Sequence, residues 1–310
     1  MKYIVLIILA GIVLSVTAKA GVLNMFRSKP YPEVFFEGEL LAVAEAMKAH
    51  DIDKAKALAE KLPDIDAPGN EHFTLLAFAV ADTNIPAIKM LMALGADPAA
   101  KLGDGEGAQS VAHFAMWRKT SDALRAMLES GMDTEITRRP ESGSRTLIFS
   151  VPELADNDSL RLLVEFGADV NAKDSLGETI LFKFISVMFD EALYLLENGA
   201  DPFVMDYSGM TAAYSVQVSL NRMDQSSDAY QKMLKIQQKM IELGVQFPAL
   251  TPYGERYRLD IVWCDDPEGY LTRSECKLVG ENEFLAPQSD ASKRQDEKIL
   301  RERYGIDANL

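Results

Sequence analysis

Short amphipathic stretches follow one another in pairs along most of the chain, from residue 37 to residue 247. In the first pair, apolar side chains recur at helical spacing and predict two helices, lined by Leu40, Leu41, Val43, Ala44 and Met47 and then by Ala55, Leu58, Ala59 and Leu62. Similar pairs follow, separated by polar turns that contain Gly. The pattern predicts an all-α fold.

The turns between the pairs recur in the same order as the helices. Gly167-Ala168-Asp169 and Gly199-Ala200-Asp201 lie 32 residues apart, and each is followed by a polar turn and then a Thr, at Thr179 and Thr211. A Thr or Ser before an apolar run caps a first helix, and a Gly after a second helix takes the left-handed conformation that ends it. The Asp after that Gly is expected to hydrogen-bond back into the turn.

This succession resembles the ankyrin repeat, whose unit of about 33 residues is a turn followed by two helices. The third pair opens Ser110-Val111-Ala112-His113-Phe114-Ala115, close to the family's Thr-Pro-Leu-His-x-Ala. The resemblance implies an ankyrin-repeat α-solenoid of about six helix-turn-helix repeats over residues 37–247, roughly two thirds of the chain. It departs from the family at Leu147-Ile148-Phe149, and at the degenerate closing triplets that start at Gly131 and Gly244.

The N-terminus has the pattern of a secretory signal. A Lys at position 2 precedes an apolar run from Tyr3 to Val16, and Ala18 and Ala20 suit cleavage before Gly21. We therefore expect residues 1–20 to be removed and the protein to be exported to the bacterial periplasm. An uncleaved inner-membrane anchor over residues 3–18 is the alternative, although a spanning helix usually needs about 20 apolar residues. A tether over 21–36 is expected to follow.

The C-terminal residues, 248–310, are predicted to be a small appendage. Pro248 and Pro252 are expected to break the repeat pattern, and alternation from Tyr257 to Trp263 predicts a strand of a β-hairpin. Cys264 and Cys276 lie beyond the hairpin turn, and in an oxidising compartment such a pair favours a disulfide over a metal or redox site. Residues 289–304 are expected to form a charged helix or a loose tail.

Charge excludes several classes of partner. The net charge is −15, with 47 acidic against 32 basic residues, so the chain has no basic footprint for nucleic acid or for anionic lipid head groups. We expect no nucleic-acid binding and no bilayer binding beyond the possible N-terminal anchor. An acidic surface would steer a basic protein partner, although solubility alone also accounts for it.

The sequence carries no catalytic or metal-binding motif that we can identify. The three His are His50, His72 and His113, and neither a zinc spacing nor a nucleophile elbow nor a phosphate loop occurs. His113 holds the position of the family's structural His. We expect no enzyme, no metal and no cofactor. A site in the appendage that uses Asp265, Asp266 or Glu268 is the remaining catalytic alternative.

Protein binding is the function that the resemblance implies, through the turn fingers and the side formed by the first helices. Large side chains late in the first helices are candidate contacts, because Met and aromatic residues concentrate at interfaces. The predicted contact residues are Met116, Trp117, Met188 and Phe189 in the helices and Asp104, Glu106, Arg138, Arg139 and Tyr207 in the fingers. An exported acidic ankyrin protein is similar to immunity proteins that neutralise a secreted toxin or lipase effector. An accessory scaffold for an envelope or oxidative-stress enzyme is the alternative.

Overall fold

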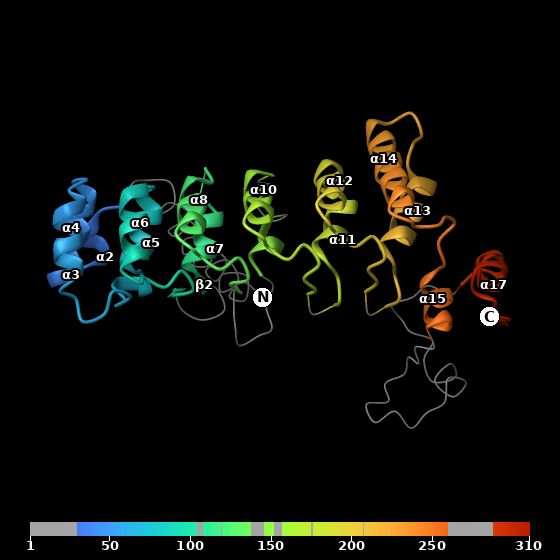
Figure 1. Cartoon of the computed structure of the whole chain (residues 1–310), viewed down its shortest axis with the longest axis horizontal. Helices are drawn as coiled ribbons and strands as arrows, with labels where there is room; N and C mark the ends of the chain where they lie inside the picture. The colour runs from blue at the N-terminus through green and yellow to red at the C-terminus, as the bar shows by residue number, and fades with distance from the viewer. Residues whose placement is uncertain are drawn as a thin grey trace, which may run out of the picture. The chain divides into compact units, whose positions relative to one another are not determined.

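Helices make up most of the described part of the chain. The computed structural model describes residues 30–103, 108–118, 120–137, 146–151, 157–174, 176–206, 208–259 and 288–310. The chain divides into an N-terminal unit, residues 1–169, and a C-terminal unit, residues 170–310. Each unit is built from helix pairs, as Figure 1 shows.

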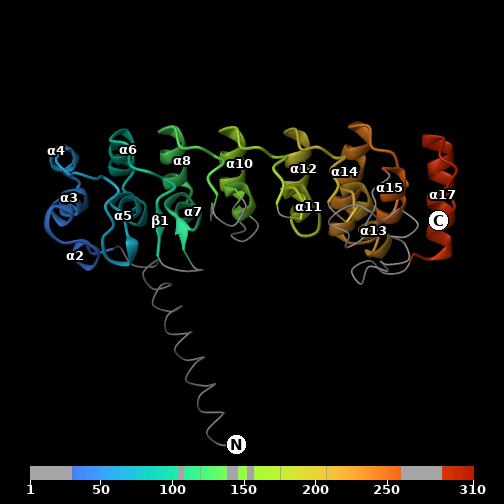
Figure 2. The same ribbon diagram turned by 90° about the horizontal axis from the view of Figure 1, so that it is seen from below.

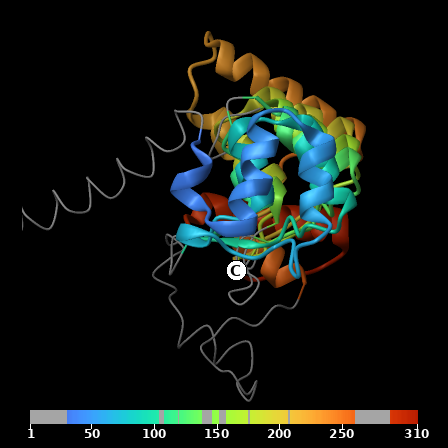
Figure 3. The same ribbon diagram turned by 90° about the vertical axis from the view of Figure 1, so that its left-hand side faces the viewer.

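The N-terminal unit stacks helix pairs whose first and second helices form two rows. After the short helix α2 (Pro32–Phe35), the pairs are α3 (Gly38–Lys48) with α4 (Ile52–Ala59), α5 (Leu75–Asp82) with α6 (Ile85–Ala93), α7 (Val111–Met116) with α8 (Asp122–Glu129), and the 3₁₀-helix η4 (Leu147–Ser150) with α10 (Asn157–Glu165). First helices contact first helices and second helices contact second helices, which gives the two rows seen in Figure 2. Figure 3 views this stack from the end that carries α3 and α4.

Three first helices start with the predicted capping bond, at Thr74, Ser110 and Thr211, whereas the prediction is wrong for Thr179, whose hydroxyl makes no capping bond to the helix Ile180–Ile185. The hydroxyl of Thr74 accepts the N–H of Ala77 at the start of α5, and the hydroxyl of Ser110 accepts the N–H of His113 at the start of α7. Each bond satisfies one of the N–H groups that the first turn of a helix leaves unpaired. The sequence therefore predicts correctly where these two first helices, α5 and α7, begin.

Helix ends follow the predicted glycine rule. Gly95, Gly131, Gly167, Gly199 and Gly244 have φ angles of 90°, 89°, 87°, 92° and 99°. A residue with a Cβ is strained at such angles, whereas Gly is not. The degenerate triplets at Gly131 and Gly244 keep this geometry, because it depends on the Gly and not on the Ala and Asp that follow.

The core of the N-terminal unit lies between the two rows and between successive pairs. In α5 every residue from Leu75 to Ala81 is buried. Aromatic rings join neighbouring pairs, with centroids 4.4 Å apart for Phe35 and Phe73 and 6.0 Å apart for Phe73 and Phe114. A helix that is apolar all round needs neighbours on both sides, which only a stack supplies.

One part of the predicted tether belongs to this core. Pro32 stands at the first position of α2, where its missing N–H costs no hydrogen bond, so it starts a helix and does not block one. Phe35 and Phe36 are buried at 5% and 1% exposure. The prediction that residues 21–36 form a tether is therefore wrong for Pro32–Phe36, and residues 1–29 lie outside the described part.

The C-terminal unit contains the expected fifth and sixth pairs. They are α11 (Ile180–Ile185) with α12 (Phe189–Glu197), and α13 (Ala212–Arg222) with α14 (Asp228–Glu242). As in the other unit, α11 contacts α13 and α12 contacts α14. Their buried side chains include Leu181, Leu195 and Ile236, each 0% exposed.

A further helix pair replaces the expected break after residue 246. Helix α15 (Pro252–Arg258) packs against α17 (Asp290–Tyr304), and Leu250, Ile299 and Leu300 form their common core. Thr251 caps α15 and Pro252 is its first residue, so Pro252 starts this helix where we predicted a break. Tyr257 and Arg258 are helical, which makes the predicted strand wrong at its start.

Asp296 holds this pair together from inside. It is 0% exposed, and its carboxylate accepts the N–H of Thr251 at 3.0 Å and binds the Thr251 hydroxyl and the Gln288 amide. Burial raises the pKa of Asp296, and the hydrogen bonds from Thr251, Gln288 and the Gly254 N–H oppose that rise. The rest of the predicted strand and both cysteines, Cys264 and Cys276, lie outside the described residues.

Candidate protein-binding surface

The polar turns that precede the first helices project from the helix pairs, and we call them fingers. In the third repeat the finger begins with an antiparallel pair of strands, β1 (Lys101–Leu102) and β2 (Gln109–Ser110), with Lys101 opposite Ser110. In the sixth, a single bridge joins Met205 to Thr211. Because at most two residues pair on each side, the shape of a finger depends on its side-chain hydrogen bonds.

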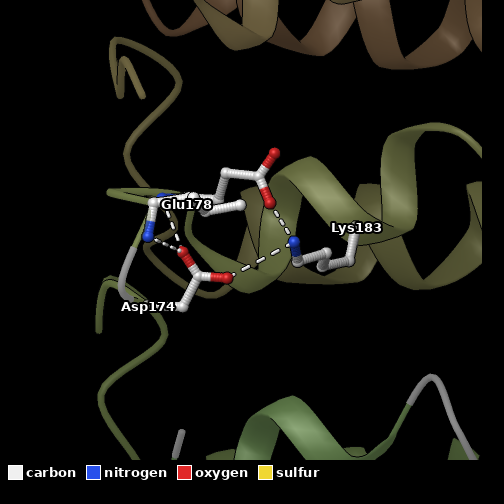
Figure 4. A network of polar contacts seen from close by, with 4 residues as sticks. Asp174, Glu178 and Lys183 are labelled. Carbon is white, nitrogen blue, oxygen red and sulfur yellow. Dashed lines mark hydrogen bonds and ion pairs between the residues drawn. The ribbon is translucent and has the colours of Figure 1, made fainter. Parts of the chain in front are cut away.

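A buried aspartate holds the finger of the fifth repeat. The Oδ1 atom of Asp174 accepts the N–H groups of Leu176 at 2.9 Å and Glu178 at 3.1 Å. The Nζ atom of Lys183, in α11, lies 3.4 Å from Oδ2 of Asp174 and forms an ion pair with Glu178 as well (Figure 4). The side chain of Asp174 is 0% exposed, so this network ties the finger to the first helix that follows it.

The sixth repeat repeats the arrangement without the lysine. The Oδ1 atom of Asp206 accepts the N–H groups of Ser208 at 2.8 Å and Met210 at 2.9 Å. In both fingers the acceptor serves the second and the fourth residue after it, and a Gly follows at the third. The sequence-level match between Asp174–Thr179 and Asp206–Thr211 therefore reflects one hydrogen-bonded turn.

The aspartates of three closing triplets turn back as predicted. The carboxylate of Asp97 accepts the N–H of Ala99 at 2.7 Å, and that of Asp201 accepts the N–H of Phe203 at 2.8 Å. The same bond runs from Glu135 N–H to Asp133 at 2.9 Å, in the degenerate triplet of the third repeat. The Asp thus fixes the point at which each finger begins.

A second set of bonds joins one finger to the next, and the sequence analysis did not predict it. The acceptor is a side-chain oxygen of the residue two positions after an aspartate of this kind, and the donor is the backbone N–H of the next such aspartate. Asp66 accepts from Asp97 at 3.0 Å, Glu135 from Asp169 at 3.0 Å, and Asn171 from Asp201 at 2.8 Å. We call this position the ladder position. Its signal is an Asp, Glu or Asn two residues after the Asp, and this signal is absent at Ala99 in the third repeat and at Phe203 in the sixth.

The predicted contact residues of the helices differ in exposure. Trp117, directly after α7, is 42% exposed, whereas Met116 is 1% exposed and lies in the core. Met116 can therefore support Trp117 but not meet a partner itself, because the last turn of α7 directs it inward. Met188 and Phe189 are partly buried, and the prediction that they stand late in the first helix is wrong, because Met188 is the N-cap of α12 and Phe189 is its first residue.

The predicted contact residues of the fingers lie outside the described residues. These are Asp104, Glu106, Arg138, Arg139 and Tyr207. The same holds for Asp265, Asp266 and Glu268, on which the catalytic alternative depends. Their contribution stays a prediction.

Arg118 anchors the end of α7 beside the exposed tryptophan. It donates from Nη2 to the carbonyl of Ala81 at 2.7 Å, and its guanidinium lies 5.7 Å from the Phe114 ring centroid. Burial lowers the pKa of Arg118, and the charge of Asp82 opposes this. The bond to Ala81 joins the third repeat to the second and holds the backbone that carries Trp117. Sequence reasoning missed it, because an Arg after a helix usually points to solvent.

Several exposed apolar side chains were also missed. Val187, Phe203 and Leu176 are 67%, 59% and 57% exposed. Leu176 stands in a finger, Val187 follows α11, and Phe203 occupies the ladder position of the sixth repeat. For Leu176, an apolar residue in a polar turn was the available signal.

An open groove of about 630 Å³ lies in the C-terminal unit, beside Phe203. The loop that starts the sixth finger forms one wall, and residues 244–250 with the ends of α15 and α17 form the other. Its rim carries Phe203, Leu259 and Tyr304. The sequence analysis did not predict this groove, because it placed no helix pair after residue 246.

Histidines and acids form no metal site among the residues that the structure describes. His113 is buried, and its Nδ1 lies 2.8 Å from the hydroxyl of Ser110, the cap of its own helix. Over those same residues no group of three His, Cys, Asp or Glu side chains is placed to hold a metal ion. Nor does any described helix have the length and apolar character required to cross a bilayer, and the predicted signal segment lies outside the search.

Comparison with known proteins finds a relative in sequence and several ankyrin repeat domains in structure. Protein PhlB of Serratia liquefaciens is 32% identical over 179 residues, which cover 56% of this chain and 75% of PhlB. No protein-family model matches the chain. The solved ankyrin repeat domain of Bcl-3 matches with a TM-score of 0.54 at 22% identity, over 68% of this chain and 90% of that one.

An ankyrin repeat domain from Acinetobacter baumannii matches with a TM-score of 0.49 at 25% identity, over 66% of this chain and 98% of that one. The Bcl-3 match concerns the fold alone, and it agrees with the capped helix pairs, the left-handed glycines and the fingers. The identity to PhlB over three quarters of that protein's length adds a relationship in sequence. The chain is thus an ankyrin repeat protein, and it belongs to the same family as Protein PhlB.

Proposed function

We propose that this protein binds another protein, without catalysis, through the fingers and the ends of its first helices in the bacterial cell envelope. The ankyrin fold suggests protein–protein interaction, because stacked repeats present a long row of equivalent positions on one side. The exported location rests on the signal-like N-terminus, residues 1–20.

The exposed ring of Trp117 is the observation that carries this proposal. Trp117 lies seven residues after the cap Ser110, and the residues at the same distance from Thr74 and Thr179 are Ala81 and Ser186. Small side chains therefore suffice at this position in those two repeats. A tryptophan that is 42% exposed there presents part of its ring to a partner, and Trp is among the residues most often found to dominate binding energy.

For the partner we propose a secreted toxin or lipase effector, which the protein would neutralise as an immunity protein. The support comes from the sequence: an exported acidic ankyrin chain without an identifiable catalytic motif. A net charge of −15 would speed the approach of a basic effector and weaken as salt screens it.

Purification of the protein with the product of an adjacent gene tests both parts of the proposal. We expect a stable complex, and we expect Trp117→Ala to weaken it by roughly 10- to 100-fold, as loss of a central aromatic contact does. Tyr31→Ala is the matched control, because Tyr31, the residue directly before α2, is an aromatic residue with 65% exposure outside the proposed surface.

The result can contradict the proposal in two ways. Equal affinity of the Trp117→Ala and Tyr31→Ala variants for the effector would show that Trp117 is not part of the binding surface. Sensitivity to peroxide in place of sensitivity to the effector, after loss of the gene, would favour the accessory scaffold over the immunity protein.

A further inference from the structure

The seventh helix pair lacks the finger that the other described repeats carry. The cap of the next first helix lies 12 positions after the closing glycine from Gly167 to Thr179 and again from Gly199 to Thr211, but only 7 positions after it from Gly244 to Thr251. Residues 245–250 therefore run directly from α14 to α15. The sixth finger has no seventh finger beside it.

The groove of about 630 Å³ lies where that finger is missing. The fifth finger meets the sixth through Asn171 and Asp201, but the ladder position of the sixth finger holds Phe203 in place of a polar acceptor. The ring of Phe203 lies over Gly244, where an added Cβ would be 3.8 Å from its Cζ atom. Phe203, Leu259 and Tyr304 are 59%, 42% and 45% exposed, so the groove has an uncovered apolar rim.

The charges around the groove differ in sign from those of the whole chain. Lys173, Arg258 and Arg303 line it together with two acids, Asp201 and Glu255, which leaves one excess positive charge in a chain of net charge −15. Arg258 is paired with Glu255 at 2.7 Å and lies 5.0 Å from the Tyr304 ring centroid.

Asp201 and Glu255 do not neutralise the other two cations of the groove, Arg303 and Lys173. Arg303 donates to the carbonyls of Gln246 at 3.3 Å and Pro248 at 2.8 Å, and within the described ranges no carboxylate pairs with its charge. Lys173 is exposed and has no acidic partner among the described residues. One carboxylate oxygen of Asp201 already accepts the N–H of Phe203 in its own turn.

From these observations we propose that the groove binds a segment of a protein partner in the place of the missing finger, and that this segment carries a large apolar side chain next to a carboxylate. The apolar side chain would cover Phe203, Leu259 and Tyr304, and the carboxylate would meet Lys173 and Arg303. This inference rests on the proposed protein-binding function and names a second contact point for it, separate from Trp117.

The proposed segment needs both its apolar side chain and its carboxylate to fit the groove. A purely apolar segment would leave Lys173 and Arg303 without a counter-charge as it covers them, which costs affinity. A basic segment would meet excess positive charge. A backbone segment also suits an open groove better than a compact ligand does, because binding pockets for small ligands enclose most of the ligand's surface.

A random dodecapeptide library on phage, selected against the full-length protein, tests this directly. We expect the enriched sequences to place Asp or Glu within a few residues of Phe, Trp, Tyr or Leu. Synthetic versions should bind with an affinity at least about tenfold lower for Phe203→Ser and measurably lower for Lys173→Glu. Val187→Ser is the matched control, since Val187 is 67% exposed and does not line the groove.

The outcomes separate this inference from the proposed function. Peptides without acids, peptides indifferent to Phe203→Ser, or no enrichment at all would overturn it. The Trp117→Ala variant should bind the selected peptides as the unmodified protein does. If Trp117→Ala abolishes the effector complex while Phe203→Ser leaves both the complex and the peptides unaffected, the groove proposal is wrong and the proposed function stands.

Discussion

At the scale of single residues, Asp174 does most to hold a described finger, and its loss can be predicted. Asp174→Ala leaves the N–H groups of Leu176 and Glu178 without their acceptor and Lys183 without one of its two carboxylates. Because the Asp174 side chain is 0% exposed, little water can replace it, and we expect a loss of about 2 kcal/mol in the free energy of unfolding. Urea unfolding followed by circular dichroism measures it.

Asp174→Asn is the matched comparison. An amide oxygen can still accept both N–H groups, so only the ion pair with Lys183 is lost, and the destabilisation should be clearly smaller. Equal losses for the two variants would show that the charge and not the turn is what Asp174 contributes.

Residues with a fixed backbone role were predictable from the sequence, and residues with a role between repeats were not. Thr74 and Ser110 cap helices and Gly95 ends one, because local geometry restricts those positions to a few residue types. Arg118 bonds to a carbonyl in the previous repeat and Phe203 faces a groove. Such roles depend on how repeats are placed against each other, which no local pattern contains.

At the scale of elements, α15 and α17 show what hid a helix pair from sequence analysis. Thr251-Pro252 matches the Thr-Pro start of the ankyrin repeat, yet Pro252 also fits a break, and an intervening segment of about 30 residues separates the two helices. Proline at the first position of a helix costs nothing, whereas inside a helix it costs about 3 kcal/mol. Which case applies depends on α17, and α17 is far away in sequence.

The contact between these helices predicts a sharp effect of one methyl group. At Gly254 an added Cβ would lie 2.7 Å from Cγ of Asp296 and 2.9 Å from Cδ2 of Leu250. Asp296 is held by Thr251 and cannot move aside, so we expect Gly254→Ala to loosen α17 from α15 at a cost of about 1–3 kcal/mol. Hydrogen exchange of residues 290–304 measures it.

Gln295→Ala serves as the control for this effect, because Gln295 is exposed on α17 and Ala is a strong helix former. Protection of α17 should stay the same or increase in that variant. Unchanged protection in Gly254→Ala would contradict the described packing of α15 on α17.

At the scale of the whole molecule, the sequence predicted the type of binding surface better than it predicted which residues lie on that surface. Recurrent fingers and first helices follow from the ankyrin pattern, and Trp117 is exposed as a contact residue must be. Met116, its neighbour in sequence, is buried, because the side a helix residue faces near its last turn depends on packing. The groove beside Phe203 depends on a finger that is absent, and an absence has no sequence signal until the helix pair after it is recognised.

Stability should be local along the chain, because in stacked repeats each repeat contacts only its neighbours. Leu91 in α6 and Leu195 in α12 are both 0% exposed, and truncation of either to Ala should cost about 2–5 kcal/mol by leaving a cavity. We expect Leu91→Ala to reduce hydrogen-exchange protection in residues 75–129 while residues 180–242 keep theirs, and Leu195→Ala to do the reverse. The two variants control each other, since the residue type and its burial are the same. A uniform loss of protection in both would mean that the N-terminal and C-terminal units unfold as one cooperative body, and a partner bound at Trp117 would then stabilise the groove as well.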